Sequence, residues 1–177
     1  MKLNFDGKKV LVTGGLGFLG SNLAIKVVEL GADVEVYDAL IPLQGGNLFN
    51  IRPIKKKVKI TIADMRDFAK ISKSVRKKDY IFNLAGTLSH IDSMKDPFGD
   101  LDINCRAQLF LLEAARKFNR DTKIVFAGTR NQYGRAQYTP VDEFHPQEPT
   151  DINGINSIAA EKYHLLYWKI YGIPTCS

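Results

Sequence analysis

The sequence predicts an α/β fold in which a doubly wound parallel sheet is covered by helices on both faces. Two observations support this class. Short apolar runs alternate with stretches of helical periodicity along residues 1–177, as is typical of right-handed strand, helix, strand crossovers. A glycine-rich turn also follows the first apolar run. A chain of 177 residues can bury a sizeable core, and we expect a single domain.

The first two expected strands enclose a helix. The apolar run at residues 8–13 indicates a buried strand, and helical spacing then continues to Gly31, a residue type that often ends helices. The apolar positions of this helix are Leu19, Leu23, Val27 and Leu30. The second strand is expected at residues 34–37 and leads into Asp38, and the turn-forming residues 42–47 predict a loop.

The same alternation continues through the middle of the chain. We expect a third strand at residues 58–62, a short helix at 67–75 and a fourth strand at 80–84. The longest helix is expected at residues 98–118, and the fifth strand at 123–127. The expected apolar face of the long helix is formed by Leu101, Cys105, Leu109, Leu112 and Ala115.

The last third begins with a long connection at residues 129–150. Such loops in compact domains are usually functional or disordered, and we favour a substrate-facing role. A helix follows at 152–171, and a sixth strand is indicated within 173–177. The predicted core face of this helix consists of Ile155, Ala159, Tyr163, Leu166 and Ile170. Three large residues outside that face suggest a covered partner surface, or partial burial in the monomer: Leu165, Tyr167 and Trp168.

The glycine turn within residues 10–20 is the strongest chemical signal. Gly14 or Gly15 permits a tight turn, and Gly17 lets the backbone approach a pyrophosphate. Gly20 allows close packing of helix and strand. The amides at the start of the helix then face the negative charge of the phosphates.

Asp38 adds to this signal because it lies at the end of the second expected strand, about 20 residues past the glycines. A carboxylate there accepts hydrogen bonds from the adenosine ribose and repels a 2′-phosphate, which favours NAD over NADP. Without the glycines, Asp38 would be interpreted as a carboxylate that caps a loop.

Composition narrows the classes of function. The net charge is +6, but the basic clusters at residues 55–59 and 76–78 precede predicted strands without interleaved aromatics, so nucleic-acid binding is not favoured. No apolar run suits a signal peptide or a membrane span, and we expect a cytoplasmic protein. Cys105 and Cys176 lack metal-ligand spacing, so free thiols and no metal site are expected.

Five parts of the sequence together resemble the extended short-chain dehydrogenase/reductase family, and most closely its nucleotide-sugar epimerases and dehydratases: residues 13–20, Asp38, residues 64–67, residues 84–86 and residues 128–134. The resemblance runs over essentially the whole chain, with its motifs in order. It implies an NAD-binding Rossmann fold, a nucleotide-sugar substrate and chemistry that begins by oxidising a sugar hydroxyl.

The resemblance also assigns roles to individual positions. The cofactor would contact Gly14, Gly15, Gly17, Phe18, Leu19, Asp38, Ala39, Asp64, Met65, Leu84, Ala85, Gly86, Asn104 and Ala127. The substrate would contact Ser89, His90, Ser93, Thr129 and Tyr133. Thr129 matches the family's site serine or threonine, whose hydroxyl bonds the reacting sugar oxygen. For Asn104, a surface asparagine is the alternative.

The chain departs from the family at its expected catalytic positions. Members carry a tyrosine and, four residues later, a lysine, where this chain has Asn153 and Ser157. The lysine and the oxidised nicotinamide lower the pKa of the tyrosine so that it acts as a base. Losing such a base typically lowers the rate by about 10²- to 10⁴-fold. Tyr133, His90 and Tyr163 are conceivable substitutes, but packing or substrate contact is favoured for each.

Two hypotheses follow from these residues. The first is an NAD-binding protein of the epimerase/dehydratase type, whose activity as this chain alone is doubtful. The second is a non-catalytic NAD-binding or interaction protein derived from such enzymes. The family's C-terminal substrate region is absent after residue 177, which suggests a truncated chain or a partner chain that supplies it. A homodimer formed through the helices near 98–118 and 152–171 is also expected.

Overall fold

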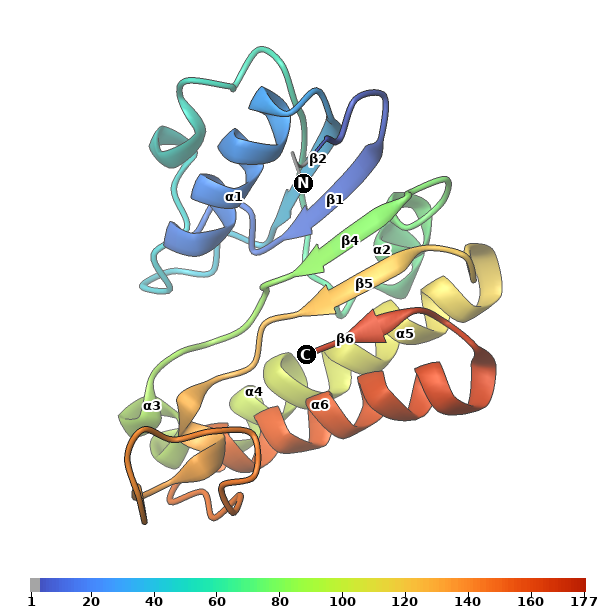
Figure 1. The fold of residues 1–177 in the computed structure, drawn as a ribbon. Coiled ribbons are helices and arrows are strands. Elements are labelled where there is room, and N and C mark those ends of the chain that lie inside the picture. Colours follow the sequence, from blue (N-terminus) through green and yellow to red (C-terminus); the bar gives the residue numbers. More distant parts are fainter. Residues whose placement is uncertain (1–3) are drawn as a thin grey trace.

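The computed structural model describes residues 4–177 and shows a six-stranded sheet flanked by helices (Figure 1). The strands are β1 (Lys9–Thr13), β2 (Asp33–Asp38), β3 (Lys59–Ile62), β4 (Tyr80–Asn83), β5 (Lys123–Phe126) and β6 (Thr175–Cys176). Their order in the sheet is β3-β2-β1-β4-β5-β6, and each neighbouring pair is parallel. The predicted doubly wound class is therefore confirmed. The strand order reverses between β1 and β4, the switch point where such sheets bind ligands.

Helices cover both faces of the sheet. The α-helices are α1 (Phe18–Glu29), α2 (Phe68–Ser74), α3 (His90–Lys95), α4 (Pro97–Leu101), α5 (Ala107–Phe118) and α6 (Ile152–Tyr171). Two 3₁₀ helices, η1 (Leu48–Ile51) and η3 (Arg130–Tyr133), and a π-helical turn, η2 (Asp102–Arg106), complete the fold. Helix α3 and both 3₁₀ helices are not foreseen in the sequence, because short helices carry little periodicity.

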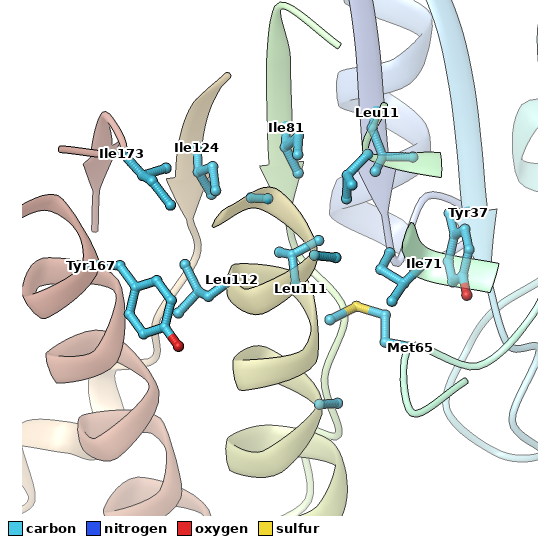
Figure 2. Close-up of a cluster of buried hydrophobic side chains, with 14 of the residues drawn as sticks. Leu11, Tyr37, Met65, Ile71, Ile81, Leu111, Leu112, Ile124, Tyr167 and Ile173 are labelled. Carbon is cyan, nitrogen blue, oxygen red and sulfur yellow. The ribbon is translucent and has the colours of Figure 1, made fainter. Parts of the chain in front are cut away.

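Alternation along the strands divides the core into two clusters. Val10 and Val12 of β1 face α1 and pack with Ala24 and Val27. Leu11, between them, points to the opposite face, where it joins the cluster formed with α2, α5 and α6 (Figure 2). The labelled members of that cluster are Leu11, Tyr37, Met65, Ile71, Ile81, Leu111, Leu112, Ile124, Tyr167 and Ile173. Both faces of β1 are buried, as expected of a central parallel strand.

The helix predicted at residues 98–118 is interrupted. The π-helical turn η2 separates α4 from α5, and its wider turn shifts the buried face. Leu101, expected in the core, is 42% exposed as a result, whereas Leu111 is fully buried. Cys105, Leu112 and Ala115 are buried as predicted.

The predicted core face of α6 is wrong for three of its five residues, whereas Ala159 and Tyr163 are partly buried and Tyr163 packs against the core. Ile155, Leu166 and Ile170 are exposed, while the opposite face is buried. That buried face consists of Asn153, Gly154, Asn156, Ser157, Ala160, His164 and Tyr167. Its residues are polar or small because this side of the helix joins a buried hydrogen-bond network, described below, so hydrophobicity alone selects the wrong side.

Two further expectations concern thiols and membranes. Cys105 and Cys176 are both free, Cys105 buried and Cys176 exposed, as predicted. Among the helices of residues 4–177, none is long and apolar enough to span a membrane. The interpretation of the N-terminus as lacking a signal peptide includes residues 1–3, which lie outside the described residues.

Candidate functional site

The two glycines that directly follow β1, Gly14 and Gly15, have different surroundings in the structure. Gly14 has φ +64°, and a Cβ on it would lie 2.7 Å from the Leu84 carbonyl oxygen. Gly14 is therefore the residue that permits the tight turn. Gly15 faces the sheet instead, because its Cβ would lie 2.8 Å from both the Val12 carbonyl oxygen and the Val36 side chain. A contact between Gly15 and the cofactor would therefore be made by its backbone, and it stays a prediction.

Helix α1 begins directly after this turn and contains Gly20. Gly20 packs so closely on the turn that a Cβ would overlap the Gly14 carbonyl oxygen. Gly17 occupies the N-cap position and supplies no capping side chain. The first turn of α1 also contains no acidic residue. The helix N-terminus therefore presents backbone N–H groups and a partial positive charge without a competing side chain.

Asp38 ends β2 and holds the glycine turn in place. Its Oδ2 accepts a hydrogen bond from the Leu16 N–H at 3.0 Å, and its Oδ1 accepts one from the Leu40 N–H at 2.8 Å. Each carboxylate oxygen has a further acceptor position. Both interpretations of Asp38 are thus compatible, because the carboxylate caps this loop and can still accept bonds from a ligand.

Asp64, after β3, forms a two-pronged ion pair with Arg66. The Arg66 Nε lies 3.0 Å and its Nη2 2.7 Å from Asp64 Oδ2. The side-chain hydrogen bonds from Arg66 lower the pKa of Asp64. Tyr37 donates its hydroxyl to the Asp64 carbonyl oxygen at 2.8 Å, and burial raises the pKa of Tyr37. These contacts fix the segment after β3 beside the end of β2.

A cavity of about 410 Å³ lies at the carboxyl ends of the central strands. Of the positions assigned to the cofactor, the lining includes Gly14, Gly17, Phe18, Leu19, Asp38, Ala39, Asp64, Met65, Leu84, Ala85, Gly86 and Ala127. Residues that sequence reasoning missed are Gly20, Tyr37, Ile41, Gln44, Gly46, Ala63, Leu88, Ile103, Ala107 and Gly128. Segments far apart in the sequence thus enclose one space whose volume lies within the range of small-molecule pockets, and we call it the main cavity.

The missed residues Ile41, Gln44 and Gly46 come from the loop after β2. This loop returns to the glycine turn, because the Asn47 N–H and the Asn50 side chain both donate to the Leu16 carbonyl oxygen, at 3.0 and 2.7 Å. The turn-forming sequence predicts a loop here but not its direction. The neighbouring Gly45 and Gly46 are the one signal that the backbone turns sharply at this place.

A smaller cavity adjoins the main cavity and contains the expected catalytic positions. Its lining includes Thr129, Asn153 and Ser157, together with Asn104. Its volume is about 50 Å³, and it shares Leu84, Ala85, Gly86, Leu88, Ala127 and Gly128 with the main cavity. The structure therefore brings Asn104 to the expected catalytic residues rather than to the main cavity.

Thr129 is positioned by a helix cap. Its Oγ1 accepts from the Asn131 N–H at 3.3 Å, and its own N–H donates to Gln132 Oε1 at 3.0 Å. This capping box fixes Thr129 at the start of η3. Because Oγ1 acts as an acceptor in the cap, its hydroxyl proton remains available to donate to a ligand oxygen.

Asn153 is engaged in buried hydrogen bonds. Its Nδ2 donates to the Thr87 carbonyl oxygen at 2.9 Å and to Asp100 Oδ2 at 3.1 Å. Asp100 also accepts from Asn104 Nδ2 at 2.8 Å and from Asn156 Nδ2 at 2.7 Å, and from the Thr87 hydroxyl at 3.1 Å. We call Asp100 with these four residues the Asp100 cluster. Asp100 is 4% exposed, so one carboxylate on α4 organises amide donors from η2 and α6.

The other expected substrate residues lie in local contacts. Ser89 caps α3, and Ser93 donates its hydroxyl to the His90 carbonyl oxygen at 2.7 Å. His90 Nδ1 lies 2.6 Å from Asp151 Oδ2. Tyr133 packs edge-on against His145. Neither the main cavity nor the smaller cavity has Ser89, His90, Ser93 or Tyr133 in its lining.

A network of buried polar side chains lies at the carboxyl ends of β1 and β4, next to the main cavity. Thr13 Oγ1 donates to Asn83 Oδ1 at 2.7 Å, and Asn83 Nδ2 donates to Gln108 Oε1 at 2.6 Å. The same Asn83 Nδ2 lies 3.3 Å from His164 Nε2, and His164 Nδ1 lies 2.8 Å from the Ala160 carbonyl oxygen. Burial lowers the pKa of His164 to about 4. The network therefore joins the ends of β1 and β4 to α5 and α6.

The strand order and the glycine turn define a Rossmann-like α/β protein. The chain belongs to the NAD-dependent epimerase/dehydratase family, within the extended short-chain dehydrogenases/reductases: the model of the family described as GDP-mannose 4,6 dehydratase matches residues 11–177. The family expectation from the sequence is therefore confirmed.

Curated relatives and solved structures agree with this assignment. The chain is 34% identical to the UDP-glucose 4-epimerase of Lacticaseibacillus casei over 168 residues, which cover 93% of the chain and 48% of that protein. It is 32% identical to the CDP-paratose 2-epimerase of Salmonella typhi, covering 94% of the chain and 55% of that protein. The chain thus spans about half the length of the curated relatives it matches.

Among solved structures, the UDP-N-acetylglucosamine 4-epimerase of Methanobrevibacter ruminantium M1, in complex with UDP-N-acetylmuramic acid, superposes with a TM-score of 0.87. Its identity to this chain is 28%, and the match covers 96% of the chain and 53% of that structure. The UDP-glucose 4-epimerase of Brucella ovis, in complex with NAD, gives a TM-score of 0.86 at 26% identity, covering 96% and 50%.

Proposed function

We propose that the main cavity binds NAD. The observation that carries this proposal is the convergence of the α1 N-terminus and Asp38 on one space of about 410 Å³. The residues present fit NAD. Gly14 and Gly17 have no side chain that would separate the backbone from a ligand in the cavity, and the α1 amides suit a pyrophosphate. The Asp38 carboxylate suits ribose hydroxyls. Relatives crystallised with NAD support the same assignment.

Asp38→Asn is expected to weaken NAD binding by roughly 10- to 100-fold, because a hydrogen bond to a charged acceptor contributes about 1.5 to 3 kcal/mol. The new amide group also faces one of the two backbone N–H groups that Asp38 now accepts from. Removal of the negative charge should in addition reduce the preference for NAD over NADP. Isothermal titration calorimetry with both cofactors measures these changes.

Asp33→Asn is the matched control, because Asp33 is the first residue of β2 and Asp38 is the last. The control makes the same substitution on the same strand at the opposite edge of the sheet. We expect its NAD affinity to equal that of the unchanged chain. Absence of NAD binding at millimolar concentration in the unchanged chain would refute the proposed cofactor.

We further propose that a nucleotide sugar binds beside NAD, with its reacting carbon at the smaller cavity. Bound NAD would supply the hydride acceptor of an epimerase or dehydratase reaction. The Thr129 hydroxyl, held by its capping box, would donate to the reacting sugar oxygen. The family resemblance assigns Asn153 and Ser157 to the positions of a tyrosine and a lysine, and neither side chain loses a proton near neutral pH to act as a base.

A panel of UDP-, GDP-, CDP- and dTDP-sugars, with NADH absorbance as the readout, tests catalysis. Asn153→Tyr with Ser157→Lys is expected to increase NAD reduction by about 10²- to 10⁴-fold over the unchanged chain, because it restores a positioned base. Asn153→Phe with Ser157→Lys is the control, since it adds the ring without the hydroxyl. Equal rates for the two double variants would contradict the proposed role of the smaller cavity.

A second candidate function is a non-catalytic NAD-binding or interaction protein. The observation that favours it is the engagement of Asn153, whose amide is buried and bonded to Asp100 and the Thr87 carbonyl oxygen. A group held in this way stabilises the fold around the site without transferring a proton. NAD binding without NAD reduction by any sugar of the panel would support this candidate.

We also propose a homodimer formed through α5 and α6. The supporting observation is a set of apolar side chains on α6 that the monomer leaves exposed: Ile155, Leu165, Leu166, Trp168 and Ile170. Leu166→Glu is expected to shift the chain to a monomer in analytical ultracentrifugation, because a carboxylate in an apolar interface is costly to bury. Lys26→Glu, which changes an exposed charged position on α1, on the opposite face of the sheet from α5 and α6, is the control. An unchanged sedimentation coefficient for Leu166→Glu would contradict this interface.

A further inference from the structure

A third cavity, which we call the amino-edge cavity, lies at the opposite edge of the sheet from the main cavity. Its volume is about 300 Å³, and its lining consists of Lys8, Lys77, Lys78, Asp79, Tyr80, Asn119, Asp121 and Lys123. Lys8 precedes β1, Lys78 precedes β4 and Lys123 begins β5. Because β1, β4 and β5 are parallel neighbours, their amino ends bring these side chains together. We propose that this cavity binds a small phosphorylated anion.

The charge of the amino-edge cavity favours an anion. Four lysines line it against two aspartates. Asp79 is already engaged, because its Oδ2 accepts from the Lys9 N–H at 2.8 Å and its Oδ1 lies 3.9 Å from Lys8 Nζ. Lys78 is largely buried and is held by Glu35 at 2.9 Å. The cavity therefore keeps an excess of positive charge after its internal pairs are formed.

Lys77 and Lys123 are the two cations with unused charge. Within residues 4–177, neither takes part in an ion pair. The Lys123 ammonium lies 5.3 Å from the centre of the Tyr80 ring, which places it against an apolar wall of the cavity. Lys123 is exposed, so its ammonium is open to an anion that enters the cavity.

The backbone of Lys77 gives an independent reason to expect function. Its φ is +57°, a left-handed conformation that is uncommon for a residue with a long side chain. The other two non-glycine residues with positive φ in the described chain are Leu40 and Leu43. Both belong to the loop that lines the main cavity. Backbone strain tends to gather at binding sites, where the surrounding structure maintains it.

The ligand class follows from the donors and the size of the cavity. Ammonium groups are compact point charges that bind phosphate oxygens without the flat geometry that a guanidinium requires. A volume of about 300 Å³ lies at the lower end of small-molecule pockets. A diphosphate, whose charge can meet both Lys77, which precedes β4, and Lys123, which begins β5, matches both features.

Lys77→Asn separates binding from strain, because asparagine adopts the left-handed conformation more readily than lysine does. Without ligand, this variant should melt about 2 °C or more above the unchanged chain, as the strain is reduced. Inorganic pyrophosphate should raise the melting temperature of the unchanged chain, and this rise should fall to less than half in Lys77→Asn and in Lys123→Gln. Differential scanning fluorimetry measures both effects.

Lys95→Gln is the matched control, because Lys95 is exposed on α3, beyond the carboxyl end of β4. Its pyrophosphate response should equal that of the unchanged chain. The glycine turn offers another place for pyrophosphate, so a rise that is the same in all four proteins would assign the anion to the main cavity and overturn the proposal. The absence of any rise in the unchanged chain would overturn it as well.

Discussion

Asp100→Ala is expected to lower the free energy of unfolding by about 3 to 5 kcal/mol. The carboxylate accepts hydrogen bonds from Asn104, Asn153, Asn156 and Thr87, and it is 4% exposed. Alanine leaves these donors facing a buried space without an acceptor. The Asn156 amide and the Thr87 hydroxyl are affected most, because Asp100 is the acceptor on which each depends in the described structure.

Two control variants assign this loss to the hydrogen bonds. Asp100→Asn should lower the free energy of unfolding by less than half as much, because its amide oxygen can replace Oδ2 and the Asn156 amide can rotate to accept from the new NH₂ group. Asp102→Ala removes only an exposed ion pair with Arg106, at 3.4 Å, and should change the free energy of unfolding by about 0.5 kcal/mol or less. Urea unfolding measures all three, and equal losses for Asp100→Ala and Asp102→Ala would contradict the role of the cluster.

The Asp100 cluster bears on function because it includes Asn153, the residue that the family resemblance of the sequence assigns to a catalytic tyrosine position. Asn153 is tied to both Asp100 and the Thr87 carbonyl oxygen. Replacing it therefore removes structural hydrogen bonds as well as adding a base. The stability of the Asn153→Tyr double variant should accordingly be measured beside its activity, so that partial unfolding is not interpreted as an inactive site.

The fold could be predicted because its signals are local and repeated. Each strand is a short apolar run, and parallel strands buried on both faces need no alternation to be recognised. The glycine turn could be interpreted for a related reason. Gly14, Gly17 and Gly20 each avoid a specific backbone overlap or approach, so their spacing records the geometry of the turn.

The rest could not be predicted because it depends on contacts between distant segments. The buried face of α6 carries Asn153, Asn156 and His164, and a hydrophobic periodicity does not identify polar residues whose partners lie elsewhere. From the sequence alone, Asp100 would be assigned to the exposed surface of a helix for the same reason. The π-helical turn η2 also displaces Leu101 from the core, and no pattern in the sequence marks it.

His164 should make stability depend on pH in the acidic range. The ring is fully buried, and its pKa falls from an ordinary value of 6.5 to about 4. The unfolded chain therefore binds a proton at a higher pH than the folded chain does. The contribution of the neutral ring is complete above pH 6.5, declines as the pH falls to about 4, and totals about 3 kcal/mol.

Burial is the main reason why the folded protein resists this proton, and the contact with Asn83 adds to it. Because the Ala160 carbonyl oxygen can only accept, His164 Nδ1 carries the hydrogen and Nε2 accepts from Asn83 Nδ2. A proton on Nε2 would face the Asn83 NH₂ group, so two donors would oppose each other in a buried place.

His164→Gln tests this account, since its amide can donate and accept but does not titrate in this range. Urea unfolding from pH 7 to pH 4 should show a smaller loss for His164→Gln than for the unchanged chain, by about 3 kcal/mol at the acidic end. Glu113, whose pKa is lowered to about 2 by Arg116, loses its contribution only below its ordinary value of 4.5, and it does so in both proteins. Parallel pH profiles for the two proteins would show that His164 is protonated in the folded state, and that the network at the base of the main cavity tolerates the charge.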